Sequence, residues 1–320
     1  MKRMKKALAM ACVAAMTAAM AIPAYAADNY KIYLISMDQM DQHWVNMDKG
    51  CKKAVEELGN VDYQWTAPDV KDDAKQIECI NNAVAGGANA ILLAANGPDA
   101  DVAALQEASD AGVKIVYVDS PANFDAVATF ATDNTAAGKT AGEQMLKALK
   151  DKGVTSGKIG LLNTNAATTS TVNREDGFRS VFKDTDFEIL ETQYSEGDAA
   201  KSKDIATNYI NQGCVGIFGT NEGCTVGTGN AIKEAGSDVV GVGFDKSDMI
   251  LGLIKDGTLL CTMAQNPDVM GYDGIKAAVA ALDGSDPGDG STTDTGVTVI
   301  TKDNVDSLGG TVSDVESAAS

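Results

Sequence analysis

Short runs of β-branched and apolar residues alternate with helical patterns along most of the chain, and this alternation restricts the possible folds more than any other feature. We expect a strand in each of ten runs, at residues 31–36, 61–66, 89–94, 114–118, 126–130, 158–163, 187–193, 214–219, 239–244 and 258–264. Amphipathic helices fill the gaps, as in the repeat of Ala74, Ile77, Ile80 and Val84. Strand–helix–strand units of this length form parallel sheets covered by helices on both faces. The predicted fold class is therefore α/β.

The ten strands divide into two sets of five, which predicts two similar lobes. The first set ends near Thr132 and the second near Gln265. Beyond the second set the pattern predicts a helix over 267–282, a polar surface loop over 284–296 and a last strand over 297–301.

Each set of strands predicts a doubly wound parallel sheet, and the chain must cross between the lobes near Thr132, Gln265 and Gly296. These three crossings form a hinge with a cleft beside it. In open parallel sheets, ligands bind beyond the C-terminal ends of the strands. The expected domains are an N-terminal lobe of residues 27–132 plus 266–295 and a C-terminal lobe of residues 133–265 plus 296–320.

Residues 1–26 have the three-part pattern of a secretory signal peptide. A segment with Lys2, Arg3, Lys5 and Lys6 precedes an uncharged apolar run, and the small-residue site Ala24-Tyr25-Ala26 ends it. The apolar run is too short for a comfortable membrane span, so a retained anchor is the weaker interpretation. We expect cleavage after Ala26 and a soluble, exported product that is periplasmic or otherwise outside the cytoplasmic membrane.

The charge balance disfavours two classes of partner. The chain has 45 acidic and 26 basic residues, and its net charge is −19. Removal of residues 1–26 takes away four positive charges and no negative one, so the mature net charge is −19 − 4 = −23. A surface this acidic repels nucleic-acid phosphates and anionic lipid headgroups.

Five cysteines remain after cleavage, and their positions argue against disulfides and metal sites. Cys51 shares a helical stripe with Met47 and Ala54, which predicts a core residue. In the usual doubly wound order Cys214 and Cys261 lie on non-neighbouring strands, and the helices of Cys51 and Cys79 cover opposite faces of a sheet. No cysteine pair has metal-ligand spacing, and the single histidine cannot complete a zinc set. We therefore expect free thiols and no metal.

Polar side chains gather where the strands end. A sugar offers hydroxyls that donate and accept hydrogen bonds, together with apolar C–H faces. Carboxylates, amides and a guanidinium match the hydroxyls, and an aromatic ring can cover the apolar face. Each such residue could also be an ordinary helix cap, but their joint position predicts a binding site. The residues at or after the strand ends are Asp41, His43, Trp44, Asp119, Arg174, Asn221, Asp245 and Gln265.

Several stretches of the chain resemble one known family in their order and spacing. They are Lys49-Gly50, 86–91, Thr132-Asp133-Asn134, Arg174-Glu175-Asp176-Gly177-Phe178, 241–245 and 264–267. Over essentially the whole mature length the chain resembles periplasmic sugar-binding proteins of the ribose/galactose type. The resemblance implies a type I periplasmic binding protein fold without catalytic residues or a cofactor. It also implies a monomer that delivers a monosaccharide to the permease subunits of an ABC importer, and it leaves a chemoreceptor open as a further partner.

The resemblance also implies roles for individual residues. Sugar contacts are implied for Asp119, Arg174, Asn221, Asp245 and Gln265. Asp41 falls where the family often has a polar residue, and His43 and Trp44 fall where ribose binders usually carry two phenylalanines.

Two departures from the family pattern argue against ribose itself. Ser120 stands where ribose binders have arginine, and Gly197 stands where they have an aromatic residue in the second lobe. A tryptophan platform with fewer arginines suits a hexopyranose or a pentopyranose at least as well.

Three other functions need to be considered for this chain: a repressor, an enzyme and the binding of another kind of ligand. A repressor effector domain shares this fold but needs an N-terminal helix-turn-helix and a basic face, whereas this chain has an export signal and 45 acidic residues against 26 basic. For an enzyme there is no phosphate-binding loop, and Gly227-Thr228-Gly229 lacks the third glycine of a dinucleotide fingerprint. His43 has no accompanying catalytic motif. The same fold with a nucleoside, a polyol or a signalling furanone as ligand stays open.

Overall fold

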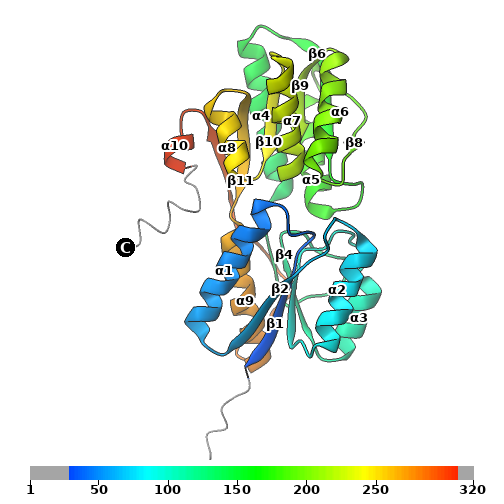
Figure 1. Cartoon of the computed structure of the whole chain (residues 1–320), viewed down its shortest axis with the longest axis vertical. Helices are drawn as coiled ribbons and strands as arrows, with labels where there is room; N and C mark the ends of the chain where they lie inside the picture. The colour runs from blue at the N-terminus through cyan, green and yellow to red at the C-terminus, as the bar shows by residue number, and fades with distance from the viewer. Residues whose placement is uncertain (1–28, 309–320) are drawn as a thin grey trace, which may run out of the picture.

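The computed structural model describes residues 29–308, which form two α/β lobes, each built on one sheet (Figure 1). The expected signal peptide and its cleavage site lie outside the described residues, as do residues 309–320. Within the described part no helix is long and apolar enough to cross a membrane.

The sheet of the first lobe is parallel throughout, as the alternating pattern predicts. Its order is β12-β5-β4-β3-β1-β2. The strands are β1 (Tyr30–Ile35), β2 (Val61–Thr66), β3 (Ala90–Leu93), β4 (Lys114–Val118), β5 (Thr129–Ala131) and β12 (Thr292–Asp294). β1, β3 and β4 are short and largely apolar, as expected of strands covered on both faces, whereas the two edge strands β2 and β12 are partly or fully exposed.

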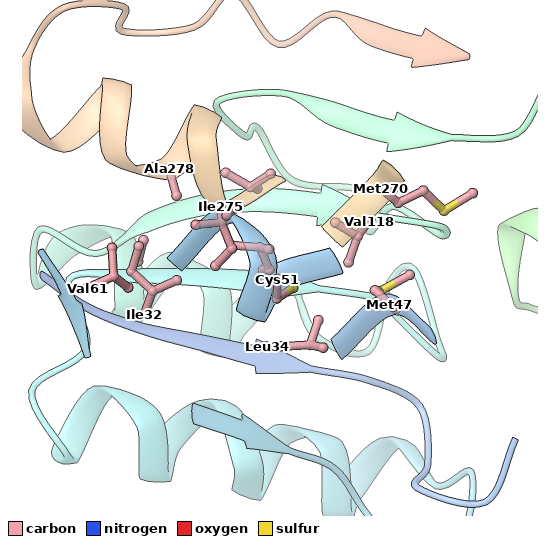
Figure 2. Packing of buried hydrophobic residues seen from close by; sticks show 14 of the residues in the cluster. Ile32, Leu34, Met47, Cys51, Val61, Val118, Met270, Ile275 and Ala278 are labelled. Carbon is pink, nitrogen blue, oxygen red and sulfur yellow. The ribbon is translucent and has the colours of Figure 1, made fainter. Parts of the chain in front are cut away.

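Helices cover both faces of this sheet. On one face α1 (Gln42–Leu58) packs against α9 (Pro267–Asp283), and on the other lie α2 (Asp73–Ala85) and α3 (Val102–Asp110). Figure 2 shows the cluster under α1 and α9, with Cys51 among side chains of β1 and α9. Cys51 is fully buried, so its predicted place in the core is confirmed.

The sheet of the second lobe has the order β13-β11-β10-β9-β6-β7, and β8 also pairs with β6. Its strands are β6 (Ser156–Asn163), β7 (Asp186–Ile189), β8 (Gln193–Tyr194), β9 (Cys214–Gly219), β10 (Val240–Phe244), β11 (Leu259–Gln265) and β13 (Val297–Thr301). Its helices are α4 (Asn134–Asp151), α5 (Thr169–Phe182), α6 (Ala199–Asn211), α7 (Glu222–Ala235), α8 (Asp248–Lys255) and α10 (Val305–Leu308). All its pairs are parallel except β11 with β13, which is antiparallel at the edge.

Within residues 29–308 the chain passes between the sheets after β5, after β11 and between β12 and β13. The exact limits predicted for the two lobes stay a prediction. One detail was wrong: the segment 284–296, expected to be a loop, contains β12, which pairs with β5. The side chains of β12 are exposed and polar, so it pairs through its backbone alone and has no apolar alternation to reveal it. The expected strand at 187–193 is likewise split into β7 and β8.

The five cysteines of the described part are free, and Cys51, Cys214, Cys224 and Cys261 are buried. Cys214 and Cys261 lie on β9 and β11, with β10 between them, as predicted. We expect a thiol titration of the denatured, unreduced mature protein to find five free thiols. A count of three or fewer would contradict the expectation.

Close helix packing at Gly50 predicts a second measurable effect. A Cβ atom on Gly50 of α1 would overlap the backbone carbonyl of Asp268 on α9, whereas one on the exposed Gly252 of α8 would meet nothing. Gly50→Ala should therefore lower the free energy of unfolding by about 1–3 kcal/mol. Gly252→Ala should raise it by roughly 0.5–1 kcal/mol, because alanine is the better helix former. Chemical denaturation measures both, and equal effects of the two substitutions would contradict this packing.

Candidate functional site between the lobes

A histidine lies between two aspartates that come from different lobes. His43 is in the first turn of α1, Asp119 directly follows β4, and Asp245 directly follows β10. His43 Nε2 is 3.3 Å from Asp119 Oδ1, and His43 Nδ1 is 3.5 Å from Asp245 Oδ1. All three side chains are buried. The two lobes thus meet through a bridge of alternating charge.

The two aspartates occupy equivalent places in their lobes. Each ends a central strand and has a positive φ, 66° for Asp119 and 73° for Asp245. Aspartate tolerates this left-handed conformation better than most residues, although it still costs about 1 kcal/mol or more. Both carboxylates face His43 on α1 of the first lobe, so the contact of His43 with Asp245 is the one that crosses between the lobes.

Arg174 connects the second lobe to the same bridge. Its guanidinium lies over the Phe244 ring, 4.2 Å from the ring centroid. Nε donates to Asn134 Oδ1 at 2.8 Å, and Nη1 donates to the Thr220 carbonyl at 2.9 Å. Nη2 lies 3.7 Å from Asp119 Oδ1 of the first lobe. The arginine is therefore held rigidly by its own lobe while its last nitrogen faces the other.

Gln265 and Asn221 are two further residues of the second lobe that line the site between the lobes. Gln265, where the chain crosses after β11, donates from Nε2 to Asp245 Oδ1 at 2.6 Å. Its Oε1 accepts from Thr132 Oγ1 at 2.9 Å, at another crossing. Asn221 caps α7, because its Oδ1 accepts from the Cys224 backbone N–H at 3.0 Å. Asn221 is thus a helix cap that also lines the cavity between the lobes.

Sequence reasoning missed two charged residues of this site. Lys71, in the loop after β2, is buried and paired with Asp38 and with Asp41, the latter at 3.1 Å. Glu222, the first residue of α7, accepts from the His43 backbone N–H at 3.1 Å. Lys71 follows a strand end and could have been found by the same rule as the others.

Glu222 caps a helix of the opposite lobe. Asp41 is the N-cap residue of α1 but makes no side-chain cap hydrogen bond. The Glu222 carboxyl group takes over this function across the cleft, 179 residues away in the sequence. One of its oxygens can accept there because the first N–H groups of a helix have no partner within the helix. No local sequence pattern reveals such a contact.

The surroundings shift the pKa values of these groups in both directions. Burial lowers the pKa of His43, but hydrogen bonds with Asp119 and Asp245 outweigh it and raise the pKa to about 10. Burial raises the pKa of Asp245, but His43 and Arg174 outweigh it and lower the pKa to about 2. Burial and the nearby Asp41 and Asp245 carboxylates raise the pKa of Glu222 to about 8. At neutral pH His43 and Asp245 are therefore ionised, whereas Glu222 is mostly protonated.

Lys71 forms ion pairs with both Asp38 and Asp41. Burial raises the pKa of Asp41 to about 6, with Lys71 opposing the shift and Asp38 adding to it. Burial lowers the pKa of Lys71, but the Asp41 and Asp38 carboxylates outweigh it, so the pKa is raised overall. The lysine therefore stays charged although it is buried.

A cavity of about 20 Å³ lies between the lobes. All eight residues selected from the sequence line it, together with Met37, Lys71, Thr164, Ser170 and Thr171. A groove of about 520 Å³ lies beside it, between α1, the start of α9 and the loop after β10. His43, Asp245 and Gln265 line both spaces. The structure thus brings the selected residues together, and their contact with a ligand stays a prediction.

Trp44 lies deeper than a simple stacking platform. It is 3% exposed and belongs to the apolar cluster under α1, with Met37 and Met47. Its ring meets the His43 ring edge-on, with centroids 4.7 Å apart. Its role as a stacking face for a sugar also stays a prediction.

Two lobes on parallel sheets, with a buried polar site where their strand ends meet, define a binding protein of the two-lobed type. Comparison of sequences makes this specific: the chain belongs to the periplasmic binding protein domain family, whose profile matches residues 32–286. Within the described residues, no group of three or more histidine, cysteine, aspartate or glutamate side chains could hold a metal ion.

Relatives cover nearly the whole chain. A ribose import binding protein of Haemophilus influenzae is 28% identical over 285 residues, which are 88% of this chain and 94% of that protein. A D-apiose import binding protein of Actinobacillus succinogenes is 28% identical over 264 residues, 80% of this chain and 82% of that protein. An ABC transporter solute-binding protein from Agrobacterium vitis, solved with bound D-fucose, is similar with a TM-score of 0.81 and 30% identity. That similarity covers 87% of this chain and 97% of that structure.

The raised pKa of Glu222 predicts that the free energy of unfolding depends on pH. Its pKa is raised from 4.5 to about 8, so the folded form binds a proton that the unfolded chain releases. This contribution is fully present below about pH 4.5 and is lost as the pH rises through about 8. Glu222→Gln removes it, so the variant should gain stability relative to the parent as the pH rises across this range. Denaturant unfolding at several pH values measures the difference, and a difference that does not change with pH would contradict the assignment.

Proposed function

We propose that the mature protein captures a monosaccharide between its lobes by hinge closure and delivers it to the permease of an ABC importer. The single observation that supports this most is the convergence of eight selected polar and aromatic residues, from both lobes, on one buried cavity. Membership of a binding-protein family and relatives named as sugar import binding proteins support the same function. The proposal includes export, with cleavage after Ala26, and no enzymatic activity.

The small size of the cavity supports the need for hinge motion. A volume of about 20 Å³ has room for about one water molecule and not for a sugar ring. A monosaccharide can enter only if the lobes separate, and it would then stand between Asp119 of one lobe and Arg174 of the other. The three crossings of the chain, two of them linked by Gln265 and Thr132, are the natural hinge. The proposed lobes keep the limits 27–132 plus 266–295 and 133–265 plus 296–320.

The local geometry supports a ligand other than ribose. A Cβ on Gly197 would lie 2.8 Å from Asn221 Nδ2 and 3.0 Å from Lys71 Nζ. The place where ribose binders carry an aromatic residue is thus next to an amide and a buried ammonium. Ser120, which stands in place of their arginine, is fully buried beside Ser170. We therefore propose a hexopyranose or a pentopyranose as the ligand.

Thermal-shift measurements identify the ligand class. The set to test is D-ribose, D-allose, D-arabinose, D-fucose and D-tagatose, with adenosine and ribitol as non-sugar representatives. A sugar present at 100 times its Kd should stabilise the fold by about 2.7 kcal/mol, which is readily measured as a higher Tm. Stabilisation by adenosine or ribitol and by none of the sugars would contradict the proposed ligand class.

Substitutions on both sides of the cavity test the site. Asp119→Ala should weaken binding of the stabilising sugar about 10- to 100-fold, because a hydrogen bond to a charged group contributes about 1.5–3 kcal/mol. Arg174→Ala should weaken it similarly and also destabilise the free protein, because Nε and Nη1 hold Asn134 and Thr220.

Arg179→Ala is the matched control for Arg174. Arg179 lies on the same helix, pairs with Glu175 and does not line the cavity. Its substitution should leave sugar affinity unchanged in isothermal titration calorimetry. Parent-like affinity in both Asp119→Ala and Arg174→Ala would show that the site is wrongly assigned.

A further inference from the structure

The two tryptophans of the chain differ in whether the indole N–H has a hydrogen-bond acceptor. Trp65, on β2, donates from Nε1 to Ser36 Oγ at 2.8 Å. Trp44 Nε1 is buried and finds no acceptor among residues 29–308. An indole nitrogen can only donate, and buried indole N–H groups usually have a partner. The lack of an acceptor at Trp44 therefore asks for an explanation.

A second hydrogen-bond donor of a residue that lines this cavity also has no acceptor. Trp44 lines the cavity with Arg174, whose Nη2 also has no hydrogen-bond acceptor among residues 29–308. The carboxylates of the cavity are already engaged. Asp119 accepts from Ser170 Oγ and faces His43, and Asp245 accepts from Gln265. Two buried donors of residues that line the cavity thus have no acceptor among residues 29–308, and the buried Thr164 hydroxyl there has no partner either.

We propose that Trp44 is a specificity-determining residue whose Nε1 donates a hydrogen bond to an acceptor oxygen of the bound sugar, a hydroxyl or the ring oxygen, in the cavity that Arg174 also lines. This inference rests on the proposed function. A sugar oxygen placed between the lobes satisfies two donors that the protein leaves without partners, and an apolar ligand cannot do so. The role differs from stacking, which uses the ring face and not the nitrogen.

Phenylalanine separates the two roles because it keeps an aromatic face and lacks the N–H. Trp44→Phe should bind the best sugar of the thermal-shift set roughly tenfold more weakly in isothermal titration calorimetry. The Tm of the ligand-free variant should fall because the smaller ring leaves a cavity in the core under α1, although no internal hydrogen bond is lost. Trp65→Phe is the matched control: it loses the bond to Ser36, so its Tm should fall while its sugar affinity stays that of the parent.

Nuclear magnetic resonance observes the donor directly. In the Trp65→Phe variant Trp44 is the only tryptophan, so the ¹H–¹⁵N spectrum contains one indole signal. Saturation with the same sugar should move its proton resonance downfield and slow its exchange with solvent. This measurement also decides the question if Trp44→Phe does not fold.

The outcomes separate this inference from the function on which it rests. Parent-like affinity of Trp44→Phe, or an indole signal that the sugar does not move, would overturn the donor role and leave sugar capture standing. If none of the tested sugars binds the parent, the proposed function fails and the inference fails with it.

Discussion

The closed arrangement of this protein depends on His43 holding the Asp119 and Asp245 carboxylates together. Each aspartate is fixed by its own lobe in a left-handed backbone conformation, and the two carboxylates would repel each other if no cation stood between them. Burial of a charge is unfavourable unless the charge is paired. The raised pKa of His43 and the lowered pKa of Asp245 are two consequences of that pairing. The bridge therefore couples the position of one lobe to that of the other.

The remaining contacts across the cleft also pair a polar group of one lobe with a polar group of the other. Glu222 satisfies the open N-terminus of α1, and Ser170 of α5 donates to Asp119. All of these groups become exposed to water when the lobes separate, and water satisfies them there. Closure is favourable only if these contacts, or the groups of a ligand between the lobes, replace that water. Sugar hydroxyls, which donate and accept, are suitable replacements, and this is the physical reason for favouring a monosaccharide as the ligand.

Much of the fold and of the candidate site could be predicted from the sequence, because strands and strand ends are marked by residues close together in the chain. The strands were visible in their apolar runs, and the rule that ligands bind beyond strand ends selected Asp119 and Asp245. Glu222 and β12 were missed because their positions depend on contacts with segments far away in the sequence. Two residues of the stretch 174–178, Arg174 and Gly177, have unrelated functions. Arg174 belongs to the cavity, whereas a Cβ on Gly177 would overlap the Thr135 carbonyl of α4, so this glycine serves helix packing.

The central claim is that a sugar joins the lobes where these charged groups meet. Small-angle X-ray scattering of the mature protein, with and without the stabilising sugar at saturation, tests it most directly. The account predicts a smaller radius of gyration in the presence of the sugar, because a sugar contacted by both lobes disfavours widely open arrangements. An identical radius of gyration in the two samples, with binding confirmed by calorimetry, would contradict capture by hinge closure.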